Sequence, residues 1–213
     1  MTFPLVTWRE KLRWMLIASQ EQSKLPLFDA VEQALEGGFT SVQLREPGMS
    51  ARELYDAAIP LRRLTRNYDA LLIINDRLDV ALAIGADGAH LGWRSLKPDA
   101  AKRASRGRLI IGCSAHNEYK ARTAVQLDAD YLTLSPIFPT ESKDGLGSPL
   151  GTEHLQSIVE SLDRPVIALG GVNSGNVCGC FNAGAHGIAL IRSVLTADDP
   201  KTAAHELIHA VAI

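Results

Sequence analysis

The sequence of 213 residues predicts an α/β protein that folds as a single (β/α)8 barrel, also called a TIM barrel. Short apolar strands alternate with helical segments along the chain, about eight strands can be counted, and polar residues follow nearly every strand. An open doubly wound sheet shows the same alternation, but it concentrates its site at one switch point. Polar residues at many strand ends therefore favour the closed barrel.

The expected strands are short and apolar, as in a parallel sheet that is buried on both faces. They lie near residues 13–18, 39–45, 70–75, 86–91, 108–113, 129–135, 164–169 and 186–191. Helices are expected between them, at residues 28–37, 51–67, 77–84, 97–105, 117–127, 152–162, 174–183 and 199–211. No stretch resembles a linker, so we expect residues 1–213 to form one domain. The irregular piece at residues 136–150 is interpreted as an active-site loop.

A recurring pattern marks each passage from a helix to a strand. Gly-Ala-Asp or a relative of it stands before a short apolar strand four times, within residues 34–39, 84–88, 127–130 and 183–187. Glycine is favoured just after a helix because it adopts the left-handed conformation without strain. Each copy therefore predicts a helix end followed by a tight turn into a buried strand.

The composition excludes several classes of protein. A formal net charge of −2 gives no general field for nucleic acid or anionic lipid, so an anion would have to be bound by local groups. No apolar run is long enough to span a membrane, and the first residues lack the order of a secretory signal. Cys113, Cys178 and Cys180 are odd in number and lack metal-ligand spacing. We therefore expect a cytoplasmic protein with reduced thiols and with no nucleic-acid or membrane partner.

The candidate site residues stand at the predicted strand ends, because the carboxyl ends of the strands form the catalytic face of this fold. Gln43 and Arg45 alternate inward and are expected at the barrel mouth. Backbone amides after the last two strands form the usual phosphate site of such barrels. The candidates are Gln43, Arg45, Asn75, Asp76, Ser114, His116, Thr140, Ser142, Lys143, Gly170, Gly171, Ile191 and Arg192.

Structural roles compete with these assignments. Asn75 and Asp76 taken alone are more typical of a helix cap. His90 lies within an apolar strand and is interpreted as a packed core imidazole rather than a ligand. The glycines at residues 170–171 could form only a turn, but their place in a barrel favours phosphate binding. The lysine within residues 140–143 could be solvated, but three hydrogen-bond donors in four residues favour an anion clamp.

Six stretches make the sequence similar to a known family. They are Val-Gln-Leu-Arg-Glu at residues 42–46, Leu-Ile-Ile-Asn-Asp-Arg at 72–77, Gly-Ala-Asp-Gly-Ala-His-Leu-Gly at 85–92, Ile-Gly-Cys-Ser-Ala-His at 111–116, Ser-Pro-Ile-Phe-Pro-Thr-Glu-Ser-Lys at 135–143 and Ala-Leu-Gly-Gly-Val at 168–172. In this order they resemble the family that contains thiamin phosphate synthase and thiazole tautomerase. The resemblance covers about residues 13–200.

The resemblance implies a reaction and a set of contacts. A synthase of this family joins a hydroxymethylpyrimidine diphosphate to a thiazole phosphate and expels diphosphate, whose charge calls for Mg²⁺ and cationic donors. The residues that match the diphosphate and Mg²⁺ contacts are Arg45, Asn75, Asp76, Ser114, Thr140, Ser142 and Lys143. Those that match the thiazole-phosphate end are Gly170, Gly171, Ile191 and Arg192.

The sequence departs from the synthase pattern at three places. Pro47 stands where the pattern has a lysine, and Ser95 stands where it has a metal-binding aspartate. Trp93 replaces a glutamine and is expected to bring bulk close to the pyrimidine or diphosphate. Residues 17–19 lack the family's aspartate at the end of the first strand. A missing lysine donor and carboxylate ligand together should cost several kcal/mol, at roughly 2–4 kcal/mol each.

These departures favour a thiazole tautomerase-like isomerase. Its substrate is a thiazole phosphate carboxylate, a small phosphorylated molecule, and the reaction moves one proton with His116 as acid–base and without a cofactor. The first alternative is a Mg²⁺-dependent synthase, in which Asp76 holds the metal alone and Arg94 or Arg192 replaces the lysine. The second is a non-catalytic barrel that binds thiamin precursors or a protein partner. The sequence leaves the oligomeric state open and allows a homodimer.

Overall fold

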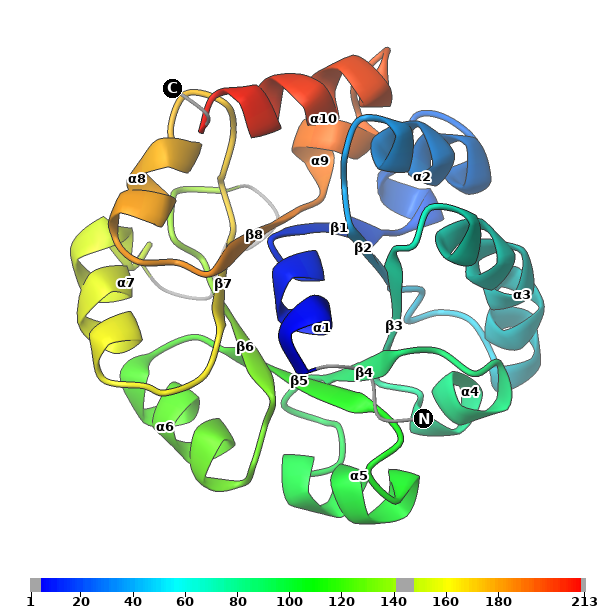
Figure 1. Ribbon diagram of the computed structural model, residues 1–213, viewed down its shortest axis with the longest axis horizontal. Helices are drawn as coiled ribbons and strands as arrows, with labels where there is room; N and C mark the ends of the chain where they lie inside the picture. Colours follow the sequence, from blue (N-terminus) through cyan, green and yellow to red (C-terminus); the bar gives the residue numbers. More distant parts are fainter. Residues whose placement is uncertain (1–4, 141–147, 212–213) are drawn as a thin grey trace.

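The computed structural model describes residues 5–140 and 148–211 (Figure 1). Eight strands close into a barrel in the order β1 to β8, and each strand runs parallel to its two neighbours. The strands are β1 Trp14–Ala18, β2 Ser41–Leu44, β3 Leu71–Asn75, β4 Gly88–Leu91, β5 Ile110–Ala115, β6 Tyr131–Leu134, β7 Val166–Leu169 and β8 Gly187–Leu190. The predicted barrel is therefore confirmed, and the open sheet is excluded.

Helices surround the barrel at the eight places that the sequence predicts. They are α2 Leu27–Glu36, α3 Ala51–Asn67, α4 Leu78–Ala83, α5 Pro98–Ser105, α6 Glu118–Gln126, α7 Gly151–Glu160, α8 Val177–Asn182 and α10 Pro200–His209. No helix within the described residues is long and apolar enough to cross a membrane. The cysteines at positions 113, 178 and 180 are all free thiols.

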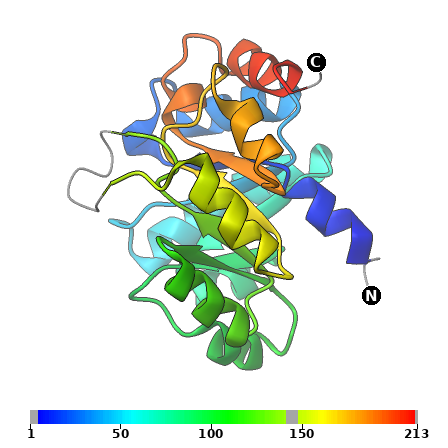
Figure 2. The ribbon, with the colours of Figure 1, turned by 90° about the vertical axis from the view of Figure 1, so that its left-hand side faces the viewer.

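Three short helical segments were not predicted from the sequence. They are α1 Leu5–Lys11, the 3₁₀ turn η1 Gln20–Gln22 and α9 Arg192–Leu195. Helix α1 precedes the first strand and covers the end of the barrel where the strands begin (Figures 1 and 2). Trp8 of this helix packs against the apolar cluster inside the barrel. The opposite end, where the strands finish, is therefore the end that is left for a site.

The core has two layers. One fills the barrel itself with the side chains of Leu12, Met15, Ile17, Leu71, Ile73, Tyr131, Ile167 and Ala189. The larger layer lies between the outward faces of the strands and the surrounding helices. Apolar side chains on both faces of the strands explain the near-continuous apolar runs in the sequence.

The recurring helix-to-strand pattern forms the turns that it predicts. The second residue after each of the four helix ends is left-handed, with φ of 104° at Gly38, 61° at Gly85, 64° at Asp128 and 83° at Gly184. Glycine tolerates this conformation, and aspartate is among the few other residues that adopt it. The four turns therefore end the helices and return the chain to the start of the next strand.

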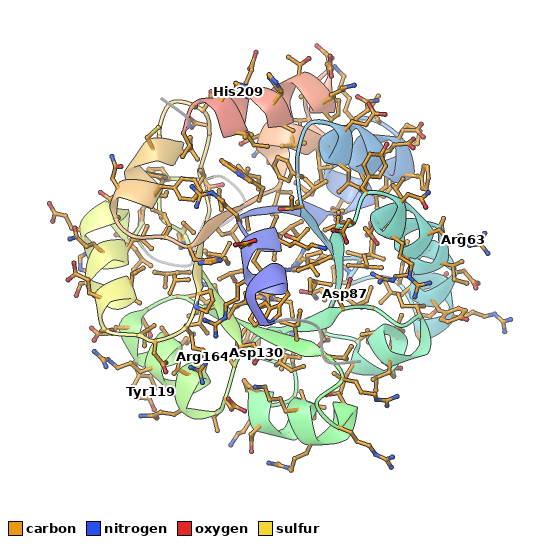
Figure 3. The ribbon with its side chains drawn as sticks, viewed as in Figure 1. Arg63, Asp87, Tyr119, Asp130, Arg164 and His209 are labelled. Carbon is orange, nitrogen blue, oxygen red and sulfur yellow. The ribbon has the colours of Figure 1, made fainter. Side chains whose placement is uncertain are left out.

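The aspartate of the pattern has a further structural role, which two copies illustrate (Figure 3). Asp87, before β4, accepts a hydrogen bond of 2.7 Å from the first free amide of β3, at Leu72. It also pairs with Arg62 of α3 at 2.6 Å. Asp130, before β6, accepts in the same way from Ile111 of β5 at 2.8 Å. Each aspartate thus joins two strands at the end of the barrel away from the site.

Candidate functional site

The first candidate site is a pocket of about 430 Å³ where β7 and β8 end. It is lined by Pro139, Thr140, Leu169, Gly170, Gly171, Val172, Asn173, Ala189, Leu190, Ile191, Arg192, Ser193 and Thr196. Five predicted site residues are thus brought together here, from the ends of three successive strands. The pocket lies where barrels of this kind bind phosphate.

Gly170 and Gly171 form a turn that only glycine fits. Their φ angles are 96° and 67°, in the left-handed region. A Cβ on Gly170 would lie 2.8 Å from Pro136 Cα, and a Cβ on Gly171 would lie 2.5 Å from the carbonyl oxygen of Pro139. The loop after β7 therefore packs directly on the loop after β6, with no side chain between this backbone and the pocket.

Two asparagines that sequence reasoning missed hold the glycine turn in place. The Asn176 side chain donates to the carbonyl oxygen of Gly171 at 2.9 Å and accepts from the backbone amide of Asn173 at 2.9 Å. The Asn173 side chain accepts in turn from the amide of Gly175 at 2.9 Å. Asparagine commonly stabilises turns by such bonds, so their presence after Gly-Gly was the available signal.

Helix α9 forms the other wall of the first pocket. Ile191 precedes this helix and Arg192 begins it, whereas the sequence predicted both as the end of the last strand. Ser193 Oγ donates to the carbonyl oxygen of Val172 at 2.7 Å, which ties α9 to the loop after β7. The first amides of a helix have no partner within it, and they favour an anion. A short extra helix after the last strand is typical of phosphate-binding barrels.

A second pocket, of about 510 Å³, lies where β3 and β4 end, across the barrel from the first (Figure 1). It is lined by Asp76, Arg77, Leu78, Asp79, Leu82, Arg94, Ser95 and Leu96. The Asp79 carboxylate is held by the Arg77 guanidinium through bonds of 2.9 and 2.5 Å, which lower the pKa of Asp79. Asp76 is the other carboxylate of this pocket and is exposed.

The structure removes the alternative role of Asn75 and Asp76. Helix α4 begins after Arg77, and no side chain caps it. Asp76 is left-handed, with φ of 65°, and its amide donates to the carbonyl oxygen of His90 at 2.8 Å. The interpretation of this pair as a helix cap is therefore wrong. Asn75 is half-buried as the last residue of β3, next to the barrel mouth.

The residues that depart from the synthase pattern lie beside this pocket. Trp93 is 82% exposed, so it does not fill a pocket as its bulk suggested. The guanidinium carbon of Arg94 lies 5.2 Å from the centre of the Trp93 ring, within range of a cation–π contact. Ser95 Oγ accepts from the amide of Gly92 at 2.8 Å and closes the turn after β4. This turn therefore presents a cation where the pattern has a carboxylate.

His90 lies inside the barrel, 3% exposed, as the core interpretation predicted. Its Nδ1 lies 3.1 Å from Tyr131 Oη. Its Nε2 lies 2.9 Å from Ser114 Oγ and 3.2 Å from Thr133 Oγ1. Burial lowers the pKa of His90 to about 3, so the imidazole is neutral. Ser114, a predicted site residue, is thus joined to a buried polar network that the sequence did not reveal.

Gln43 and Arg45 occupy different levels of the barrel. Gln43 is 1% exposed and its Nε2 lies 3.7 Å from Met15 Sδ, so it belongs to the barrel interior. Arg45 follows the end of β2, is exposed, and donates its amide to the carbonyl oxygen of Ala18 at 2.9 Å. Only Arg45 is placed where solvent and a ligand can reach it.

The remaining predicted residues lie after β5 and β6. His116 is half-buried, and its Nδ1 donates to the carbonyl oxygen of Ser135 at 2.8 Å. In a neutral imidazole this bond leaves Nε2 with the lone pair. Thr140 lies in the first pocket. Ser142 and Lys143 lie outside the described residues.

Comparison with known proteins identifies the family. The family model TMP-TENI, described as thiamine monophosphate synthase, matches residues 14–194. The chain belongs to this family.

Relatives within this thiamine monophosphate synthase family are closely similar. The thiamine-phosphate synthase of Archaeoglobus fulgidus is 42% identical over 86% of this chain and 86% of its own. That of Pyrococcus abyssi is 41% identical over 94% of this chain and 95% of its own. A solved thiamine phosphate pyrophosphorylase from Pyrococcus furiosus is 39% identical, covers 96% of this chain and 97% of its own, and superimposes with a TM-score of 0.88.

These relatives correct the reaction expected from the sequence. All three carry synthase-type names, so the tautomerase expectation is wrong and the synthase alternative fits the family better. The expectation gave the departures at residues 47, 93 and 95 too much weight. The physical reason is that Trp93 points into solvent instead of filling the site, and that the neighbouring Arg94 adds a cation. His116 was expected to act as acid–base in the tautomerase reaction. This role is therefore dropped together with that reaction.

Proposed function

We propose that this protein is a thiamine-phosphate synthase. It would join hydroxymethylpyrimidine diphosphate to a thiazole phosphate and release diphosphate, in the cytoplasm that its free thiols favour. The observation that carries this proposal is the pair of separate pockets, one where β7 and β8 end and the other where β3 and β4 end, on opposite sides of the barrel. A reaction between two phosphorylated substrates requires two anion sites, whereas the isomerisation of one phosphate monoester requires only one.

The first pocket suits the thiazole phosphate. Gly170 and Gly171 expose backbone there, α9 begins at the wall of the pocket, and Arg192 belongs to the lining. Backbone amides and an arginine match the charge and the acceptor geometry of a phosphate monoester. Ile191 provides apolar surface beside them for the ring.

The second pocket, together with Arg45 and Ser114, suits the pyrimidine diphosphate. Arg45 follows the last residue of β2, Asn75 is the last residue of the neighbouring β3, and Ser114 is the last residue but one of β5, the strand beyond that of His90. The family resemblance assigns Thr140, Ser142 and Lys143 to the same anion, although in the structure Thr140 lines the first pocket. These donors would neutralise the charge that grows on diphosphate as it leaves.

Arg94 is the residue that we propose in place of the missing lysine. It lines the pocket that contains Asp76, whereas Arg192 lines the other pocket. The cation–π contact with Trp93 favours a guanidinium at this position. An arginine also binds two phosphate oxygens at once, which a lysine cannot do.

Asp76 fits a role as the protein ligand of Mg²⁺. This ion takes one or two carboxylates and fills its other positions with phosphate oxygens and water. The described residues contain no group of three His, Cys, Asp or Glu side chains that could hold a metal by themselves. Asp76 would therefore bind Mg²⁺ together with the diphosphate, and the ion would neutralise the leaving group's charge.

The proposed reaction needs positioning more than proton transfer. The bond between the pyrimidine's methylene carbon and the diphosphate oxygen breaks, and the oxygen keeps the electron pair. The same carbon forms a bond to the ring nitrogen of the thiazole, which supplies its own lone pair. The two pockets would hold these reactants toward each other across the mouth, so that a bimolecular step becomes effectively unimolecular.

The test is thiamine phosphate formation from the two substrates, with Mg²⁺ and with EDTA. We expect product only with Mg²⁺, and a loss of about 10²–10³-fold in kcat/KM for Asp76→Asn. Asp163→Asn, an exposed carboxylate on the turn before β7, is the matched control and should keep wild-type activity. Product formation that is equal in EDTA, or a fully active Asp76→Asn variant, would refute the proposed metal role. The absence of product under all conditions would refute the synthase.

A further inference from the structure

The barrel interior contains a hydrogen-bonded chain that leads from its middle to the mouth. Tyr131 Oη, His90 and Ser114 Oγ are joined by contacts of 3.1 Å at Nδ1 and 2.9 Å at Nε2. Tyr131 is fully buried and His90 nearly so, whereas Ser114 is half-buried. Neither Tyr131 nor His90 contacts a ligand in the proposed mechanism. The mechanism therefore gives this chain of hydrogen bonds no role so far.

The partners of Tyr131 determine the tautomer of His90. Within the described part of the chain, His90 Nδ1 is the one hydrogen-bond partner of the Tyr131 hydroxyl. Within the same part of the chain, the buried Thr133 hydroxyl has Nε2 as its one partner, and a neutral ring accepts at only one nitrogen. A buried O–H without an acceptor costs about 1–3 kcal/mol, and a phenol O–H is a stronger donor than an aliphatic one, so the Tyr131 hydroxyl donates to Nδ1. Nδ1 must then carry the lone pair, which places the proton of the neutral ring on Nε2.

The proton on Nε2 determines what Ser114 can do. Nε2–H donates to Ser114 Oγ at 2.9 Å and is shared with Thr133 Oγ1 at 3.2 Å. Ser114 therefore accepts from the imidazole and cannot donate back to it, because Nε2 has no lone pair left. Its own proton is left to donate in another direction, and Ser114 is the member of the chain nearest the mouth.

We propose that Tyr131 and His90 are positioning residues that hold the Ser114 hydroxyl as a hydrogen-bond donor to the diphosphate. The proposal rests on the synthase function above and deepens it. In the opposite tautomer Nε2 would accept one hydrogen bond, and Ser114 Oγ at 2.9 Å is nearer to it than Thr133 Oγ1 at 3.2 Å. Ser114 would then turn its proton toward the ring and present oxygen lone pairs to an anion, which repel it. The direction of one proton inside the barrel thus decides whether Ser114 attracts or repels the leaving group.

Two features of the barrel maintain this arrangement. Gly112 leaves room for the Tyr131 ring, because a Cβ at this position would overlap the ring and the hydroxyl. The His90 ring is also 3% exposed and has only hydroxyl groups as partners among the described residues, so it stays neutral and keeps one donor and one acceptor. A charged imidazole would have two N–H groups, and one of them would face the Tyr131 hydroxyl proton.

The tautomer can be read directly from long-range ¹H–¹⁵N correlation spectra of the histidine side chains. We expect the Nε2–H pattern for His90 in the wild-type protein, and a gain of the Nδ1–H form in Tyr131→Phe. Tyr55→Phe, an exposed tyrosine on α3, is the matched control and should leave the His90 signals unchanged. An Nδ1–H pattern in the wild-type protein would overturn the proposal.

The consequence for the ligand is measured with inorganic diphosphate and Mg²⁺ by titration calorimetry. Loss of one oriented neutral hydrogen bond should weaken binding about 3- to 10-fold in Tyr131→Phe, and Tyr55→Phe should bind as the wild type does. Unchanged binding in Tyr131→Phe would overturn the positioning role alone. If the wild-type protein binds no diphosphate, both the proposed synthase function and the donor role of Ser114 are overturned. The spectra would still report the tautomer of His90 in that case.

Discussion

Arg94 lines the same pocket as Asp76, at a turn where the synthase pattern has no cation. A single charge-assisted hydrogen bond contributes about 1.5–3 kcal/mol, which corresponds to roughly 10- to 100-fold in rate or affinity. We therefore expect Arg94→Ala to lower kcat/KM for the pyrimidine diphosphate by about that factor, in a steady-state assay with saturating thiazole phosphate. Arg94→Lys should recover part of the loss.

The control for this prediction is Arg63→Ala. Arg63 is exposed on the outer side of α3, away from the barrel mouth (Figure 3). Its loss should leave kcat/KM unchanged. Full activity in Arg94→Ala would contradict the account and would leave the missing lysine without a replacement.

His90 predicts a pH dependence of stability. Its pKa is about 3 in the folded protein and about 6.5 when unfolded, so the unfolded chain takes up the proton first. This contribution to stability is complete above the unfolded value and is lost as pH falls toward 3. Between pH 7.5 and pH 5 the wild-type free energy of unfolding should fall by about 2 kcal/mol more than that of His90→Gln. Urea titrations at both pH values check this, and equal losses in the two proteins would contradict it.

At the scale of single residues, the sequence predicted where the candidate site residues stand along the chain but not their hydrogen-bond partners. Asp76, Ser114 and Arg192 were predicted from their places after strands, because the barrel assigns strand ends to the site. Tyr131 and Thr133 were missed because a tyrosine and a threonine within an apolar strand are also what a core requires. Whether a buried group serves the core or the site depends on contacts across neighbouring strands, which one sequence does not contain.

At the scale of elements, the glycine turn after β7 is the part of the site that tolerates least change. A Cβ on Gly171 would meet both backbone strain at a φ of 67° and crowding from Phe138 and Pro139. We expect Gly171→Ala to cost about 2–4 kcal/mol of stability and to weaken thiazole-phosphate binding at least 10-fold. Denaturant titration and calorimetry measure the two effects.

Gly107 provides a matched control for strain without crowding. Its φ of 66° is nearly that of Gly171, but a Cβ there would meet nothing within 4 Å. It lies in the turn after α5, before β5 begins, at the far end of the barrel from the site. Gly107→Ala should cost about 1 kcal/mol and leave binding unchanged. Equal effects of the two substitutions would show that crowding at residue 171 does not matter.

The elements that were predicted and those that were missed differ in length and pattern. Helix α3 was predicted at its observed bounds because its 17 residues repeat apolar positions over several turns. Helix α9 has four residues, fewer than periodicity can reveal. The Gly-Ala-Asp turns were predicted because a left-handed backbone after a helix favours glycine, which can be seen in the sequence. The hydrogen bonds of Asp87 and Asp130 were not predicted, because they depend on which strands become neighbours in the barrel.

At the scale of the whole molecule, closure of the barrel creates the two-substrate site. The first pocket is built from segments after β6, β7 and β8, and the second from segments after β3 and β4. Closure places these segments, distant in sequence, around one mouth, while α1 covers the other end (Figure 2). The fold class was predictable because it rests on alternation and strand count. The number of anion sites, one or two, could not be predicted from the sequence, because it depends on whether Trp93 fills a pocket or faces solvent.

The central claim is that one barrel mouth joins two phosphorylated substrates. ³¹P spectroscopy of the protein with hydroxymethylpyrimidine diphosphate, thiazole phosphate and Mg²⁺ tests it most directly. We expect inorganic diphosphate and thiamine phosphate to appear in equal amounts and at equal rates, and we expect no thiamine phosphate signal when the thiazole phosphate is omitted. Spectra in which both substrates persist unchanged, while the protein remains folded, would contradict it.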